Sequence, residues 1–214
     1  MTTARRRDEQ RDATKALLLD AARDLFTRYG FDGTSVAMVC ERAGVTHGAL
    51  YHHFDGKLGL FDDTLQAVTG SVAEAIASRI SAATGWDRLC AAIEAFLDQY
   101  SRPEVATIVL SDGPRVVGRD RFAEIDRAAN EPLLTGLLNS AIDDNVLRPV
   151  TVSLTARVFA GSLEQAAAVI AETDNGDRDR VRGELRSLLL SWLAALRHPP
   201  GIDDTRASRS ARRE

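Results

Sequence analysis

Several residue types that build particular classes of protein are scarce in this chain. Its 214 residues include two cysteines, four histidines and only 6% aromatic residues. Two cysteines cannot supply a disulfide framework, and neither Cys40 nor Cys90 has a partner at the spacing of a zinc site. We therefore expect two buried, reduced thiols, as in a cytoplasmic protein, and a core built mainly from aliphatic side chains.

Long apolar runs and catalytic patterns are also missing. No stretch approaches the ~18 uninterrupted apolar residues of a membrane-spanning helix, and no apolar run follows the N-terminal basic residues as in a signal peptide. The sequence shows no catalytic carboxylate pair, no glycine-rich phosphate loop, and no serine or cysteine paired with histidine in a known arrangement. We expect no membrane insertion, no cofactor and no enzymatic activity, with an all-α enzyme kept as an unfavoured alternative.

Charge is distributed unevenly along the chain. The net charge is −4, but the first fifteen residues carry a cluster of basic side chains, and acidic residues are plentiful after Asp62. The overall charge does not exclude nucleic acid, because charge acts through its local distribution. We predict that residues 1–12 form a disordered arm, which serves either as a plain solubilising tail or as a contact to DNA. The basic side chains of the first fifteen residues are Arg5, Arg6, Arg7, Arg11 and Lys15.

Residues 34–54 have the pattern of two short helices joined by a tight turn. Apolar residues recur at three- and four-residue spacing, as on one helix face: Val36, Val39, Cys40 and Ala43. We expect Thr34 to cap the first helix and Gly44 to end it in the left-handed conformation. Thr46 then caps a second helix at 47–53, with Leu50 and Phe54 turned inward. This is the helix-turn-helix plan, whose second helix enters the major groove of DNA.

The side chains of the second helix suit contact with DNA. Small residues let the backbone approach closely, and the free N–H groups at its start can seat a phosphate. We assign to the groove Thr46, His47, Gly48, Ala49 and His52, with the two histidines as the main base readers. We assign Thr34, Tyr51 and Lys57 to phosphate. His53 is expected to pack, and no metal is expected because at most two of the three histidines share a helix face.

The stretch Leu17 to Phe61 resembles the DNA-binding domain of the TetR family of bacterial transcriptional regulators. The motifs that carry the resemblance are Phe26 with Tyr29-Gly30, Gly33-Thr34-Ser35-Val36, Ala43-Gly44-Val45-Thr46, Leu50-Tyr51-His52-His53-Phe54, and Lys57 with Leu60. Leu58 departs from the pattern, because an acidic residue often follows the lysine in this family. The resemblance implies a DNA-binding regulator, by default a repressor.

The remainder of the chain predicts further helices and an all-α fold. We expect a first helix at 13–29, ended by Gly30, a long connecting helix at 57–83, and helices at 86–100, 104–111, 119–145, 153–172 and 177–197. Pro132 predicts a kink or break. The predicted organisation is a three-helix helix-turn-helix domain at 1–56, a helical effector-binding and dimerisation domain at 57–198, and a disordered basic tail at 199–214.

The last two helices carry more apolar surface than one core requires. The first has a small-residue face, and the second is leucine-rich and includes Trp192. We expect a homodimer in which residues 153–172 and 177–197 of two copies form a four-helix bundle, as the resemblance also implies. Such a dimer would hold two DNA-reading helices about 34–36 Å apart, or a multiple of it, on a near-palindromic double-stranded operator.

Helices 86–145 mix apolar residues with scattered polar ones, as ligand pockets do. We predict that a small apolar effector binds there, tilts the helix that begins at Lys57, and releases DNA. The predicted lining residues are Phe96, Tyr100, Leu110, Phe122, Asn130, Leu134, Phe159 and Gln165. The alternative is an architectural DNA-binding protein that responds to no ligand and has a filled body.

Overall fold

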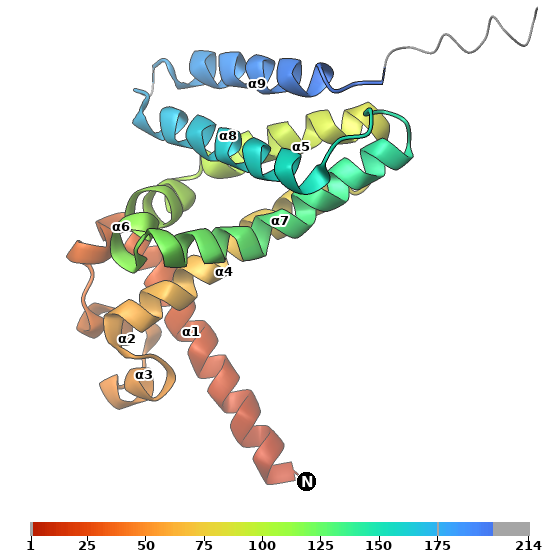
Figure 1. The fold of residues 1–214 in the computed structure, drawn as a ribbon. Helices are drawn as coiled ribbons and strands as arrows, with labels where there is room; N and C mark the ends of the chain where they lie inside the picture. The colour runs from red at the N-terminus through yellow and green to blue at the C-terminus, as the bar shows by residue number, and fades with distance from the viewer. Residues whose placement is uncertain (1, 175, 199–214) are drawn as a thin grey trace, which may run out of the picture.

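The computed structural model describes residues 2–174 and 176–198, and these form helices without a β-sheet (Figure 1). The expected all-α class is confirmed, and the predicted tail at 199–214 lies outside the described residues. The elements are α1 (Thr2–Gly33), α2 (Val36–Ala43), α3 (His47–His53), α4 (Gly56–Arg79), α5 (Gly85–Tyr100), the π-helix η1 (Val105–Asp112), α6 (Gly113–Val117), α7 (Arg119–Asp143), α8 (Val152–Glu172) and α9 (Arg178–Ala194).

The molecule has a small head and a larger body (Figure 1). The head comprises α2, α3 and the part of α1 that packs on them. In the body, α5, α7 and α8 surround a common interior, and α9 lies on the outside next to α8. Helix α4 starts beside α3 and runs into the body, so it is the connector that the sequence predicted.

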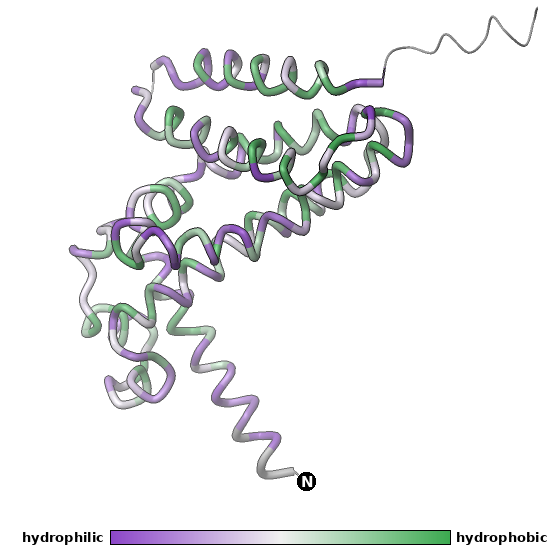
Figure 2. The backbone as a smooth tube through the Cα atoms, viewed as in Figure 1, coloured by the Kyte–Doolittle hydropathy of each residue, from purple (hydrophilic) through white to green (hydrophobic). Residues whose placement is uncertain are grey.

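Helix α1 starts at Thr2, well before the predicted start at Ala13. The expectation of a disordered arm at 1–12 is therefore wrong for the described residues. This segment contains neither proline nor glycine, and Arg5 Nε lies 3.1 Å from Glu9 Oε1, a pair four residues apart that supports a helix. Its first turns are hydrophilic and extend beyond the head (Figure 2).

Gly30 interrupts α1, as predicted, with φ 65° and ψ 178°. Glycine adopts this positive φ without steric cost, because glycine has no Cβ. The kink brings Phe31 against Phe26 and against Phe61 of α4. The Phe61 ring makes edge contacts with both, at centroid distances of 5.1 and 5.2 Å. Head and connector thus share one aromatic core.

The cap of α2 differs by one residue from the prediction. Ser35 is the N-cap, and its hydroxyl accepts the Met38 N–H at 3.2 Å. Thr34 is buried instead, and its hydroxyl donates to the Gly30 carbonyl at 2.8 Å. The kink at Gly30 presents that carbonyl to Thr34. Gly44 ends α2 at φ 68° and ψ 31°, which confirms the left-handed cap.

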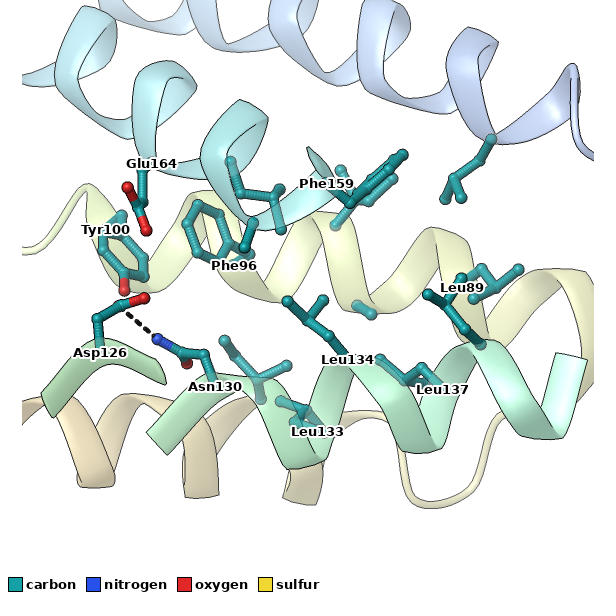
Figure 3. A pocket seen from close by; sticks show the side chains of 17 residues that line it. Leu89, Phe96, Tyr100, Asp126, Asn130, Leu133, Leu134, Leu137, Phe159 and Glu164 are labelled. Carbon is teal, nitrogen blue, oxygen red and sulfur yellow. Dashed lines mark hydrogen bonds between the residues drawn. The ribbon is translucent and has the colours of Figure 1, made fainter. Parts of the chain in front are cut away.

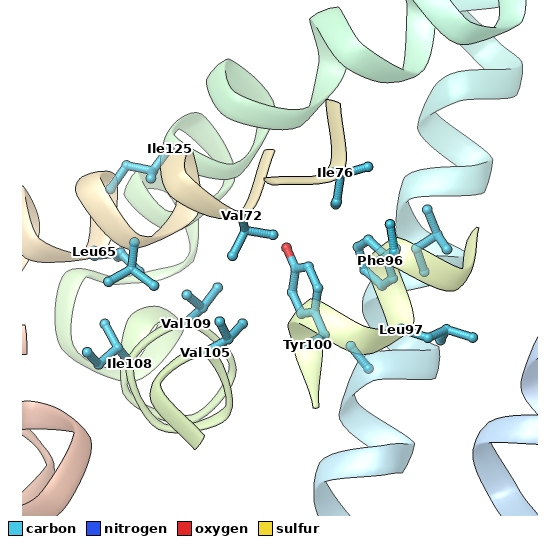
Figure 4. Packing of buried hydrophobic residues seen from close by; sticks show 14 of the residues in the cluster. Leu65, Val72, Ile76, Phe96, Leu97, Tyr100, Val105, Ile108, Val109 and Ile125 are labelled. Atoms are coloured by element: carbon cyan, nitrogen blue, oxygen red, sulfur yellow. The ribbon is translucent and has the colours of Figure 1, made fainter. Parts of the chain in front are cut away.

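Two segments of the body depart from expectation. Residues 105–112, where the sequence predicted a helix at 104–111, form a π-helix that leads directly into α6. Figure 4 shows its side chains Val105, Ile108 and Val109 facing α4 and the Tyr100 ring. Helix α7 continues through Pro132 without a break. Among the described residues, no helix is both long and apolar enough to cross a membrane.

Candidate functional site

Helix α3 is short, and local contacts fix it. The Thr46 hydroxyl accepts the Ala49 N–H at 3.2 Å, as predicted for its N-cap. Leu50 is fully buried and, with Phe54, anchors the helix to the core of the head. Because Leu50 is the only residue of α3 that is buried, most of the helix remains available to a partner.

The outward face of α3 carries the side chains that were assigned to the groove. Thr46, His47, Gly48 and His52 are exposed, and Ala49 is half-buried. Tyr51, assigned to phosphate, is 61% exposed. His53 is half-buried, with its ring 6.2 Å from that of Phe54, which agrees with a packing role. Burial, and then the charge of His52, lower the pKa of His53.

Two residues assigned to phosphate have partners inside the protein. Thr34 is 2% exposed and its hydroxyl is engaged by Gly30, so it cannot serve as a phosphate contact on this surface. That assignment is corrected. The Lys57 ammonium lies 4.1 Å from the centroid of the Phe31 ring, a cation–π contact within the head. Lys57 is half-buried, so any contact with phosphate competes with this one.

The start of α1 adds basic surface next to α3. A groove on the head is lined from α1 by Asp8, Gln10, Arg11 and Thr14 and from α3 by His52 and His53. Arg11 is exposed and lies on the same side of the head as the exposed His52. The basic segment noticed in the sequence is thus helical, and its Arg11 shares a face of the head with His52.

The body contains an apolar cavity of about 60 Å³ between α4, α5, α7, α8 and α9. Five of the eight predicted pocket residues line it: Phe96, Tyr100, Asn130, Leu134 and Phe159. The structure places the other three elsewhere. Leu110 lies on η1, Phe122 packs against Gly113, and Gln165 lines an outer groove between α8 and α9. Their helices were predicted, but the faces that turn inward were not.

One end of the cavity is polar (Figure 3). Tyr100 from α5, Asp126 and Asn130 from α7, and Glu164 from α8 gather there, while Leu89, Leu137 and Phe159 line the apolar remainder. The Asn130 amide donates to Asp126 Oδ1 at 2.7 Å. Burial raises the pKa of Asp126. Burial of its carboxyl, and then the neighbouring Asp126, raise the pKa of Glu164 to about 7.

Sequence reasoning missed the two carboxylates. Asp126 precedes Asn130 by four residues and so shares its helix face, and Glu164 follows the buried Leu163. The shared face with Asn130 was the one signal available for Asp126, and no sequence signal marked Glu164. The same residues also line a second, more open groove of about 210 Å³, so the polar end is the part of the cavity nearest to solvent.

Polar contacts join the body to the head and to the connector α4. Asp112, at the end of η1, accepts the Phe31 N–H at 2.6 Å. Arg115 bridges Asp112 and Asp32, at 2.7 and 2.9 Å. Arg121 of α7 binds both oxygens of Asp62 on α4, at 2.9 and 2.8 Å. The hydrogen bond from Arg121 lowers the pKa of Asp62.

The outer face of α8 and α9 is apolar and open. Val158 is 70% exposed and Trp192 is 48% exposed, and Leu154 and Leu188 are exposed beside them. Val158, Leu188 and Trp192 line a groove between the two helices. Trp192 points away from the cavity, on the face that the sequence assigned to a dimer. A run of large exposed apolar residues marks an interaction surface.

Comparisons with known proteins match both parts of the chain. Residues 18–64 match the family described as "Bacterial regulatory proteins, tetR family", and residues 86–191 match "Tetracyclin repressor-like, C-terminal domain". The chain is 27% identical over 185 residues to the HTH-type transcriptional repressor KstR2 of Rhodococcus jostii, covering 83% of this chain and 90% of KstR2.

Solved structures share the whole fold. A TetR-family regulator from Pectobacterium atrosepticum superposes with a TM-score of 0.78 at 27% identity, covering 94% of this chain and 100% of that one. FadR of Bacillus subtilis, solved in complex with stearoyl-CoA, has a TM-score of 0.67 at 20% identity and covers 82% and 97%. With the exposed, capped α3 in the head, these matches show that the chain belongs to the TetR family of DNA-binding transcriptional regulators.

Proposed function

We propose that this regulator is a cytoplasmic, non-enzymatic repressor that binds a near-palindromic operator as a homodimer and leaves it when a small effector enters the body. The observation that carries the proposal is the pairing of an open, capped α3 with a separate cavity in the body. An architectural DNA-binding protein would need only the first. The similarity to the repressor KstR2 supports repression.

The dimer is proposed to form through α8 and α9. Their exposed apolar side chains, Leu154, Val158, Leu188 and Trp192, form a face that a second copy would cover. A two-fold axis brings the same face of both copies together and yields a four-helix bundle. Each head then presents one α3 to one half-site.

Within each head, DNA contacts divide into two kinds. Tyr51 and the free N–H groups behind the Thr46 cap are proposed to hold phosphate, together with Lys57 and basic residues of α1 such as Arg11. His47 and His52 are proposed to read base edges, with Gly48 and Ala49 allowing close approach. Phosphate contacts set register, and base contacts set sequence.

The effector response is proposed to follow from the size of the cavity. Ligand pockets usually have volumes of ~300–1,000 Å³, whereas this cavity holds about 60 Å³. A ligand must therefore separate the helices around it. Ile76 of α4 is part of the cavity wall, and α4 begins at Gly56 beside α3, so separation moves the connector and changes the spacing of the two heads.

Selection of bound fragments from genomic DNA, followed by fluorescence anisotropy, tests the proposal. We expect a near-palindromic site and binding as a dimer. His47→Ala should change which base is preferred at one position of each half-site. Tyr51→Phe should weaken binding to all DNA sequences alike. A monomer that ignores every duplex at low salt, or two variants with the same pattern of loss, would contradict the proposal.

A further inference from the structure

The polar end of the cavity carries negative charge that the described residues do not neutralise. Asp126 is 8% exposed, and one of its oxygens accepts from Asn130. Among residues 2–174 and 176–198, no basic group lies within 4.0 Å of the Asp126 or Glu164 carboxylates. A buried carboxylate without a cation is unfavourable unless it is protonated or gains a partner.

The groups around the pair do not supply that partner. Arg127 and Arg157 line the more open groove of about 210 Å³ together with Glu131, but none of the three lines the inner cavity. From α5, the Tyr100 hydroxyl faces Asp126 (Figure 3). Burial, and then the charge of Asp126, raise the pKa of Tyr100, so this phenol stays neutral.

The Asp126 and Glu164 carboxyls face each other from α7 and α8 (Figure 3). Two carboxyl groups so close cannot both ionise freely, and they share protons as a pair. Burial raises the pKa of Asp126, and the pKa of Glu164 is raised to about 7. Near neutral pH the pair is therefore partly protonated, and it loses its shared proton as the pH rises.

We infer that the effector is an apolar molecule with a protonated amine, whose head lies between Asp126 and Glu164 and whose tail lies among the leucines. The inference rests on the proposed function, in which this cavity receives the effector. An ammonium group donates three hydrogen bonds. The carboxylates, the Asn130 amide oxygen and the Tyr100 oxygen are acceptors at this end of the cavity.

Two further features favour a cation over an anion. Phe96 and Tyr100 stack with their ring centroids 4.1 Å apart beside the polar end, and the faces of aromatic rings attract cations. A carboxylate or phosphate head would instead add like charge to a pair that already shares a proton. The other lining side chains are apolar and suit an aliphatic or aromatic tail.

Three probes with similar tails and different heads test the inference. Decylamine, decanoate and 2-undecanone, each below its micelle concentration, are titrated into the full-length protein by calorimetry. We expect decylamine to bind at least about tenfold more tightly than decanoate, because loss of a buried charge partner has an effect of this size or more. Equal or tighter binding of decanoate, or no binding of decylamine, would overturn the inference.

Variants identify the residues that hold the amine. Asp126→Asn and Glu164→Gln preserve shape, and at pH 8, where the pair has lost its shared proton, each removes one negative charge. At that pH each should weaken the binding of decylamine at least about tenfold, with little effect on the binding of 2-undecanone. Glu131→Gln is the matched control, because it removes a carboxylate that lines the more open groove but not the inner cavity. Glu164 is an exposed residue, so its variant is expected to fold even if Asp126→Asn does not. Unchanged decylamine affinity in Glu164→Gln would overturn the inference.

The pH dependence separates an amine from a carbonyl ligand. Decylamine remains protonated, like a lysine, up to about pH 10, and its binding should tighten between pH 5.5 and 8 as the carboxyl pair loses its shared proton. A ligand that accepts from a protonated carboxyl would weaken over the same range, and that trend for decylamine would contradict the inference. Operator affinity is measured in the same samples. Decylamine that binds without releasing DNA would support the ligand class and contradict the release step of the proposed function.

Discussion

The head and the body use their polar side chains in opposite ways. In the head, the candidate contacts point outward from one seven-residue helix held by the Thr46 cap and the buried Leu50. In the body, they point inward from several helices onto a cavity of about 60 Å³. In the proposed function, the surface of the head is complete before DNA arrives, whereas the body must change shape to admit a ligand. The head is therefore proposed to recognise DNA and the body to respond to the ligand.

The contacts between the head and the body decide whether the two parts act independently. Phe61 places α4 in the core of the head, and Asp112 holds the backbone of the head at Phe31. The first contact is apolar and stabilises both parts together. The second is polar and lies at the end of a π-helix whose Val105 and Val109 face Tyr100, a residue of the cavity wall (Figure 4). Substitutions at the two contacts separate these roles.

The largest effect is expected from Phe61→Ala. The Phe61 side chain is fully buried among Phe26 and Phe31, and such truncations cost about 3–5 kcal/mol. If the head depends on α4, operator binding should be lost while the body still unfolds cooperatively in urea. Leu58→Ala on the same helix is the control, because Leu58 is exposed and its loss should cost under about 0.5 kcal/mol. Equal losses in the two variants would contradict a shared core.

Asp112→Ala tests the polar link. Its carboxylate accepts from Phe31 and from Arg115, so its loss should cost about 1–3 kcal/mol of folding free energy. Operator affinity without effector should change little, but release by an effector should require more ligand, because the body no longer holds the kink at Gly30. Anisotropy titrations with and without effector measure this ratio. The exposed neighbour Ser111→Ala should behave as wild type, and an unaltered ratio in Asp112→Ala would exclude this route.

The two regions also differed in how well the sequence predicted them. In the head, the α3 bounds, the Thr46 cap and the Gly44 cap depend on neighbours in sequence, and all were predicted correctly. The cap of α2 was missed because Thr34 and Ser35 both carry hydroxyls, and only the kink at Gly30 decides between them.

In the body, Asp126 and Glu164 were missed because each, read on its own helix, resembles a solvated polar position. Only the packing of α7 against α8 brings them together (Figure 3). The assignments of Leu110 and Phe122 to the pocket were wrong for the complementary reason. An apolar residue indicates burial, but not the side of the helix on which it is buried.

A smaller effect should separate the caps of α2 and α3. Ser35 and Thr46 each accept one backbone N–H at 3.2 Å, so replacing either with alanine should cost about 1 kcal/mol of stability. Only Thr46 is proposed to face DNA. Operator affinity should therefore fall about fivefold in Thr46→Ala and remain near wild type in Ser35→Ala, measured at one salt concentration. Equal affinities for the two variants would remove Thr46 from the DNA surface.

The smallest effect concerns pH and stability in the body. The pKa of Glu164 is about 7 in the folded protein and ~4.3 in an unfolded chain, so the folded state binds this proton more tightly. Its contribution to stability is complete below the unfolded value and is lost as pH rises through about 7. Asp62, whose pKa is lowered, contributes stability that is lost as the pH falls. The pH dependence of the wild type therefore combines several groups, and a variant is needed to isolate Glu164. Glu164→Gln should gain stability relative to wild type at pH 8 compared with pH 5.5, measured by thermal unfolding. The gain should be modest because Glu164 is an exposed residue, and an identical difference at both pH values would show that the carboxyl pair does not share a proton in the folded protein.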